Sequence, residues 1–106
     1  MNGRDMVEIR EIGEGPARAV AIHVRLPGEG ANLLVVRAEE GYLMCGYLNL
    51  AIAEEVGDAA ALVTGVGTID QFLNGRVAAV TTGARGRGVV AGMAVREALD
   101  RLGPGR

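Results

Sequence analysis

Apolar and polar residues alternate along the first part of the chain, which is the pattern of half-buried β-strands. The alternation runs through Val7-Glu8-Ile9-Arg10 and again from Arg18 to Leu26. Leu33 to Val36 is apolar on both faces, as in a central or interface strand. Glu39-Glu40-Gly41 then predicts a short hairpin connection to a strand over Tyr42 to Cys45. Strands this close together in sequence favour an antiparallel meander.

The strand from Arg18 to Leu26 has two different faces, because successive side chains point to opposite sides of a sheet. One face is purely aliphatic, whereas the other mixes small, polar and charged residues. The first face carries Val20, Ile22, Val24 and Leu26, and the second carries Ala19, Ala21, His23 and Arg25.

The second half of the chain changes to the periodicity of helices. An apolar residue recurs every four positions from Leu48 to Val56, and Gly57 stands where a helix-terminating glycine belongs. Thr68-Ile69-Asp70-Gln71 has the spacing of a capping box, which predicts a short helix that ends by Gly75. A last helix is predicted from about Val89 to Leu102.

Two further strands, Ala59 to Val63 and Arg76 to Thr81, are each followed closely by a Thr-Gly pair, a glycine-containing loop and a helix. If these strands are parallel neighbours, both loops lie at the strand ends where α/β proteins bind ligands. A small anion would be held best by the two arginines of the second loop. Helix capping in the first loop and a solvated second loop are the alternative interpretations. The candidate ligand-binding residues are Thr64, Gly65, Gly67, Thr68 and Asp70 in the first loop and Thr82, Arg85, Arg87 and Gly88 in the second.

The amino-acid composition excludes several classes of catalytic and binding chemistry. The 106 residues are 49% hydrophobic and 23% charged, with a formal net charge of -2, which is typical of one ordinary globular domain. The chain has no Lys and no Ser, so a serine nucleophile, a Schiff-base lysine and a lysine phosphate-binding loop are excluded. The negative charge and three aromatic residues argue against nucleic acid as a partner. No apolar stretch approaches the ~18 residues of a membrane span, and we expect a cytoplasmic protein.

Cys45 and His23 are the only cysteine and histidine of the chain, which excludes an internal disulfide and a zinc site of the usual type within one chain. Cys45 ends a predicted strand just before a helix, where a reactive thiolate can be stabilised. The alternative is that Cys45 is a small buried core residue. In a simple meander His23 lies two strands away, about 10 Å from Cys45 and beyond hydrogen-bond reach.

Three blocks of sequence carry a family resemblance: Gly41-Tyr42-Leu43-Met44-Cys45-Gly46, residues 65–73, and residues 88–93 together with 96–99. In this order they resemble the YunC-like domain of unknown function of bacteria and archaea, over about residues 18–102. The resemblance implies an α/β domain whose N-terminal strands mediate oligomerisation to a tetramer. It supplies no substrate and no catalytic residue, and only places Cys45, the Thr68/Asp70 loop and the Gly88–Met93 segment in the shared pattern.

The sequence therefore predicts one α/β (α+β) domain over residues 1–106, with flexible ends at 1–5 and 103–106. Residues 6–46 are expected to form an oligomerising antiparallel sheet, and residues 47–102 two or three strand–loop–helix units with a C-terminal helix. The leading functional hypothesis is a homo-oligomer that binds a small anionic ligand between the two glycine loops. The alternatives are a Cys45-dependent enzyme and a structural or regulatory assembly module. No catalytic constellation, metal site or cofactor is identified.

Overall fold

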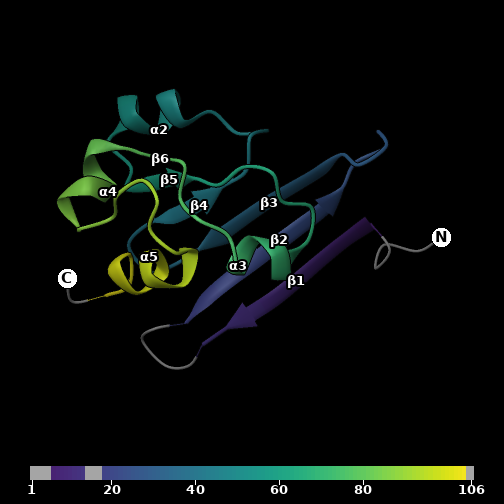
Figure 1. The fold of residues 1–106 in the computed structure, drawn as a ribbon, viewed down its shortest axis with the longest axis horizontal. Helices are drawn as coiled ribbons and strands as arrows, with labels where there is room; N and C mark the ends of the chain where they lie inside the picture. The colour runs from purple at the N-terminus through teal and green to yellow at the C-terminus, as the bar shows by residue number, and fades with distance from the viewer. Residues whose placement is uncertain (1–5, 14–17, 105–106) are drawn as a thin grey trace.

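One six-stranded sheet runs through the molecule, and the computed structural model describes residues 6–13 and 18–104 (Figure 1). The strands are β1 (Val7–Ile12), β2 (Ala19–Arg25), β3 (Asn32–Arg37), β4 (Tyr42–Met44), β5 (Ala60–Leu62) and β6 (Ala79–Val80). They lie in chain order across the sheet. Every neighbouring pair is antiparallel except β4 and β5, which are parallel. This mixed sheet with its helices confirms the predicted fold class, and β1 to β4 form the predicted meander.

Four short helices complete the described part of the fold: α2 (Leu50–Val56), α3 (Ile69–Leu73), α4 (Thr82–Gly86) and α5 (Val95–Arg101). The parallel pair β4 and β5 is joined through α2, as parallel neighbours require a crossover connection. The helices α3 and α5 lie over one face of the sheet (Figure 1). Within the described residues, no helix has the length and apolar character needed to cross a membrane.

The face beneath α3 and α5, which we call the covered face, holds the main core. Leu34 and Val36 of β3 and Leu43 of β4 are fully buried there, together with Phe72 of α3 and Val95 of α5. On β2 this face presents the small-residue side of the strand, where Ala19, Ala21 and His23 are all buried. Small side chains at these positions allow a helix to approach the sheet closely.

The opposite face of β1, β2 and β3, which we call the open face, carries larger apolar residues. They are Val7, Ile9, Val20, Ile22, Val24 and Val35, as the strand registers and the alternation of side chains require. Ile9 is 68% exposed and Val7 40% exposed. The apolar cluster described on this side of the sheet contains only residues of β4, α2 and β5. The helix α2 therefore shields one end of this side and leaves the open face uncovered.

The helix α2 ends at the predicted glycine, but its apolar stripe does not face the core. The Asn49 side chain accepts hydrogen bonds from the backbone N–H groups of Ala51 and Ile52, and Gly57 ends the helix at φ 86°. Leu48, Ile52 and Val56 are 37%, 53% and 65% exposed, whereas Ala53 is buried. A stripe at helical spacing indicates a helix without indicating which partner covers it.

The last third of the chain corrects three predictions. The C-terminal helix begins at Val95 rather than near Val89, because Gly88 and Gly92 take positive φ angles that interrupt a helix. The strand expected over residues 76–81 is shortened to Ala79–Val80. The expected loop at residues 83–88 contains α4, whose first turn is capped by the Thr81 hydroxyl.

The chain end also differs from the expected pattern. The segment expected to be flexible at 103–106 includes Gly103, which is buried and whose carbonyl accepts a hydrogen bond from the Arg87 guanidinium at 3.0 Å. Residues 1–5 and 105–106 of the expected ends lie outside the described residues.

Candidate functional site

The two glycine loops that the sequence brings together lie at opposite ends of β5. The premise of a shared site was that the two strands are parallel neighbours. They are neighbours but antiparallel, with Ala61 opposite Val80 and Leu62 opposite Ala79. Residue 64 therefore follows one end of β5, and residue 82 lies beside the other end. The predicted site between the loops is not formed.

The second loop has its own internal partners. The Glu54 carboxylate of α2 accepts hydrogen bonds from the Thr82 backbone N–H at 2.9 Å and from the Thr82 hydroxyl at 3.0 Å. Arg87 donates to the carbonyl oxygens of Arg101 and Gly103 at 3.3 and 3.0 Å. Arg85 is exposed on α4. The anion at the start of α4 is thus a side chain of the protein itself, which the sequence did not reveal.

The first loop, by contrast, borders a cavity of about 250 Å³. Its wall is formed by Gly30 and Asn32 at the start of β3, by Cys45–Tyr47 after β4, and by Val63–Val66 after β5. The cavity therefore lies at the carboxyl ends of the parallel pair β4 and β5. Crevices at such strand ends are where open α/β sheets bind their ligands. Of the predicted site residues, Cys45, Thr64 and Gly65 meet at this cavity.

Cys45 is held at the cavity wall by β3. Its backbone N–H donates to the Leu34 carbonyl at 3.0 Å, and its Sγ accepts from the Leu34 backbone N–H at 3.3 Å. The residue is 4% exposed. Cys45 is therefore buried in the core, as the second interpretation expects, and it also borders the cavity. Its reactivity stays a prediction.

Asn32 is the cavity residue that the sequence analysis missed. Its Oδ1 lies 2.7 Å from Nε2 of His23, and its Nδ2 donates to the Gly30 carbonyl at 3.1 Å. His23 is 2% exposed, and its Nδ1 has no hydrogen-bond partner among the described residues. A signal was present in the sequence, because strand alternation places Asn32 on the same face of β3 as Leu34.

His23 and Cys45 do not form a catalytic pair within the chain. His23 is opposite Leu34 in the register of β2 and β3, and Leu34 in turn is bonded to Cys45. Two strand spacings, about 10 Å, separate the backbones of the two residues. The register therefore places the two residues two strands apart, as the meander predicts.

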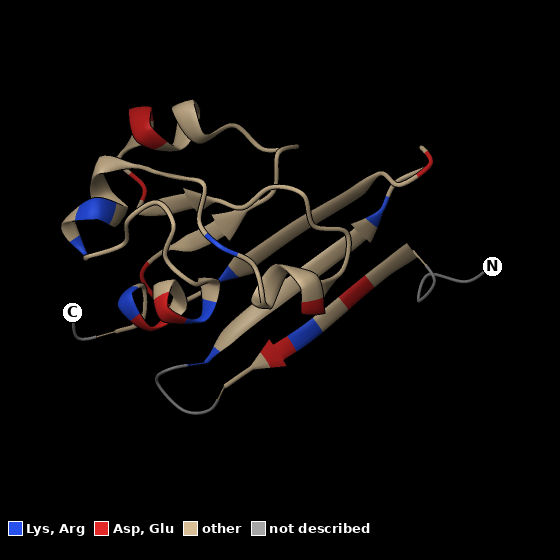
Figure 2. Cartoon of the chain, viewed as in Figure 1, with Lys and Arg blue, Asp and Glu red and all other residues tan. Residues whose placement is uncertain are grey.

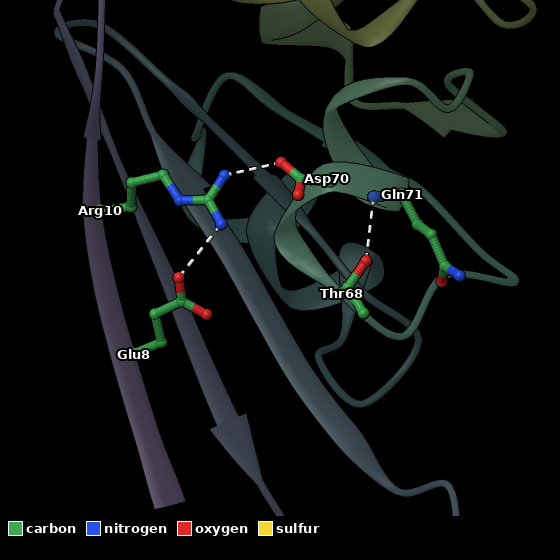
Figure 3. A network of polar contacts seen from close by, with 5 residues as sticks. All are labelled: Glu8, Arg10, Thr68, Asp70 and Gln71. Atoms are coloured by element: carbon green, nitrogen blue, oxygen red, sulfur yellow. Dashed lines mark hydrogen bonds and ion pairs between the residues drawn. The ribbon is translucent and has the colours of Figure 1, made fainter. Parts of the chain in front are cut away.

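Thr68 and Asp70 have structural roles. The Thr68 hydroxyl accepts from the Gln71 backbone N–H at 3.1 Å, which confirms the cap, and the Gln71 side chain accepts from the Gly67 backbone N–H at 2.8 Å. Figure 3 shows Asp70 paired with Arg10 of β1, with 2.7 Å between Oδ1 and Nη1. Arg10 also contacts Glu8 at 3.1 Å. Hydrogen bonds from the guanidinium, first to Asp70 and then to Glu8, raise the pKa of Arg10.

A metal does not explain this site. Within the described ranges, no group of three or more His, Cys, Asp or Glu side chains is arranged to hold an ion. The polar side chains at the cavity wall are Asn32, Cys45, Tyr47 and Thr64. These groups offer neutral hydrogen bonding and one thiol.

The fold and the cavity define a small mixed α/β domain with a neutral pocket at the ends of its parallel strands. The chain belongs to the family described as Domain of unknown function (DUF1805), whose family model matches residues 44–102. It is 40% identical over 86 residues to the uncharacterized protein YunC of Bacillus subtilis (strain 168), covering 77% of this chain and 83% of that protein.

A solved structure has the same fold. The crystal structure of TA1206, a protein of unknown function from Thermoplasma acidophilum, matches with a TM-score of 0.83 and 35% sequence identity. The match covers 92% of this chain and 94% of that one. Together with the family match, it confirms the resemblance found in the sequence, whereas the described function of each relative is unknown.

Proposed function

We propose that this chain is a small-molecule-binding module whose ligand occupies the cavity beside Cys45. The observation that supports this most directly is the position of the cavity at the carboxyl ends of β4 and β5, where a thiol, an amide and a hydroxyl meet. Ligand sites are typically concave and lined by apolar groups with a few placed polar atoms. Val63 and Val66 supply the apolar part of this wall.

The cavity favours an uncharged ligand over the anion suggested by the sequence. None of the described residues that line it is charged. Arg85 and Arg87, on which the anion hypothesis rested, belong to the other end of β5. The volume of about 250 Å³ lies just below the ~300–1,000 Å³ of common ligand pockets. A small neutral compound is therefore the occupant we propose.

A thermal-shift panel of small neutral and anionic metabolites, combined with native mass spectrometry of freshly purified protein, tests the proposal. Binding to the folded state raises the melting temperature. We expect the shift caused by the best compound to be lost in Asn32→Leu and retained in Arg85→Ala, a control at the other end of β5. A shift that needs Arg85 and not Asn32, or no saturable compound at all, would overturn the proposal.

A Cys45-dependent enzyme is the second candidate, favoured by the contact of this residue with the cavity. A free thiol of this kind suits a reducing compartment such as the cytoplasm. Iodoacetamide labelling of the native protein discriminates the two roles. Labelling faster than that of an unstructured cysteine peptide would support a reactive thiol, and slower labelling would leave Cys45 as a wall of the cavity.

Self-association through the open face is a further part of the proposed function. Ile9, Ile22 and Val35 are in register across the three strands of the open face and form an apolar row. Figure 2 shows charged residues of β2 and β3 only near the strand ends. On β1, Glu11 lies on the open face opposite Val20, so the uncharged part of this face is centred on Ile9 and Ile22. Large exposed apolar patches of soluble proteins mark interaction surfaces. A second copy is a natural partner, because a two-fold axis brings the same patch from both subunits together.

Sedimentation of the wild type over a range of concentrations measures this assembly. We expect more than one 11.0 kDa subunit, and a tetramer is the specific expectation. Ile22→Glu should reduce the assembly to single subunits, whereas Arg85→Ala should leave it unchanged. A wild type that remains a folded single subunit at high concentration would contradict the proposal. An intact assembly that binds no compound would leave assembly alone as the role of the chain.

A further inference from the structure

The Asn32 side chain is held by two hydrogen bonds that fix which way its amide group points. Its Nδ2 donates to the Gly30 carbonyl at 3.1 Å, an oxygen that can only accept. The opposite amide orientation would place two acceptor oxygens against each other. Oδ1 must therefore be the atom that faces Nε2 of His23 at 2.7 Å.

The amide orientation in turn fixes the state of the His23 ring. Since Oδ1 can only accept, Nε2 must carry the proton and donate. A neutral ring then leaves a lone pair on Nδ1, which is buried without a partner among the described residues. Among the described residues, Asn32 is the one hydrogen-bond partner of the ring. His23 itself does not line the cavity.

One polar hydrogen of Asn32 remains for a ligand. The second hydrogen of Nδ2 has no partner in the part of the chain that the structure describes. Gly67 lies beside this donor, since a Cβ added there would be 3.4 Å from Nδ2, and Asn32 itself lines the cavity. This N–H without a partner therefore belongs to a residue of the cavity wall, and contacts with Gly30 and His23 fix its orientation.

We propose that His23 is a positioning residue that fixes the Asn32 amide as the hydrogen-bond donor of the cavity, and that the ligand is a small uncharged carbonyl compound. This inference rests on the proposed function, because it assigns the ligand class of the same cavity. A carbonyl oxygen accepts the free Nδ2–H without bringing a charge into a wall that has none. Cys45, which directly follows β4, lines the same cavity.

Saturable alkylation of Cys45 by iodoacetamide tests the role of both residues. The sulfur displaces iodide: an S–C bond forms, the C–I bond breaks, and the thiol proton passes to solvent. Iodoacetamide carries a carboxamide oxygen, whereas iodoethane is a comparable alkylating agent without one. We expect the half-saturating iodoacetamide concentration to rise about three- to tenfold in Asn32→Leu and His23→Leu, as for the loss of one hydrogen bond.

The conservative variant separates positioning from simple packing. His23→Gln keeps an N–H donor and should return the half-saturating concentration to near its wild-type value. The limiting rate at saturation should stay similar in all variants, and iodoethane should show no difference among them. Circular dichroism confirms that each compared variant is folded. Long-range proton–nitrogen NMR of the wild type, with its single histidine, should place the ring proton on Nε2.

The outcomes distinguish the two proposals. If wild-type labelling does not occur or does not saturate, the cavity does not hold a carbonyl compound beside Cys45 and this inference fails, whereas the proposed function is decided separately by the thermal-shift panel. If it saturates but His23→Leu behaves as the wild type, only the positioning role of His23 fails. A ring proton found on Nδ1 would overturn the inference without any variant.

Discussion

The two faces of the first strands differ in an unexpected way. A simple rule places the more apolar face of a strand in the core, but β1 and β2 leave their more apolar face uncovered. The covered face carries alanines and His23 on β2 and the charged pair Glu8 and Arg10 on β1. The open face carries aliphatic residues, among them Ile9 at 68% exposure. On β1 and β2 the more apolar side is therefore the side that the chain's own helices do not cover, whereas β3 also places Leu34 and Val36 in the core of the covered face.

The two faces of this short sheet therefore have different roles: one packs against the chain's own helices, and the other is an apolar surface without a cover in the described chain. On the covered face, the helices supply the bulk, and small residues on β2 leave room for the His23–Asn32 pair at the edge of the cavity. On the open face, the strands supply the bulk themselves and lack a cover within the described chain. A domain of 106 residues builds only one modest core. A second copy of the chain is the economical cover for the other face.

The largest expected effect compares neighbouring residues of β3 that point to opposite faces. Leu34→Ala should lower the free energy of unfolding by about 2–5 kcal/mol, because it opens a cavity in the core. Val35→Ala should cost about 1 kcal/mol in dilute protein, where its side chain is only partly buried. Urea denaturation monitored by circular dichroism measures both changes.

Measuring the same two variants at several protein concentrations tests whether a second copy covers the open face. If a second copy covers the open face, the cost of Val35→Ala should grow as concentration rises, whereas the cost of Leu34→Ala should grow much less. Equal and concentration-independent losses for the two variants would show that the faces do not differ as described.

Local patterns predicted most elements of the fold, because they depend on local physics. Alternation identified β1 and β2, and a run that is apolar on both faces identified β3. Gly57 and Thr68 marked helix ends through conformational freedom and a side-chain cap. The same alternation separated the two sides of β2 correctly. It could not say which side is covered, since that depends on helices that come later in the chain.

The candidate site was predicted less completely, because it depends on strand direction. The loop beginning at Thr64 and the residue Cys45 were identified from local sequence, and both border the cavity. The loop beginning at Thr82 was joined to them only by assuming that β5 and β6 are parallel. Asn32 was missed because its role depends on its hydrogen bonds with His23 and Gly30, which are long-range or turn contacts.

A smaller effect on stability is expected from Tyr42 of β4, which packs against the apolar cluster beneath α2. Burial, and then a 2.6 Å hydrogen bond to the Asp58 carboxylate, raise the pKa of Tyr42 to about 12 from the ordinary 10.0. The folded state then holds this proton more tightly than the unfolded state. The resulting stability is fully present below pH 10 and should be lost as pH rises towards 12.

Urea denaturation across this alkaline range measures the loss, and Tyr42→Phe should show a shallower fall than the wild type. In Tyr47→Phe, the tyrosinate absorbance follows Tyr42 alone, since the chain has two tyrosines. Asp58→Asn should lower the pKa of Tyr42 only in part, because burial remains. An unchanged titration midpoint in Asp58→Asn would remove the hydrogen bond from this explanation.

The smallest expected effect compares two exposed ion pairs of β1. Arg10 joins β1 to Asp70 of α3 on the covered face, across 60 residues of sequence, whereas Glu11 pairs with Arg18 at 3.3 Å near the β1–β2 connection. Exposed ion pairs contribute little and are screened by salt. Asp70→Asn should nevertheless lower the melting temperature more than Glu11→Gln, because Asp70 ties a helix to the edge strand and its charge also suits the first turn of α3. Scanning calorimetry at low and high salt should show both differences shrinking as salt is added. A larger effect for Glu11→Gln would mean that α3 does not hold β1 in place, and that β1 is retained by β2 and the cover of the open face alone.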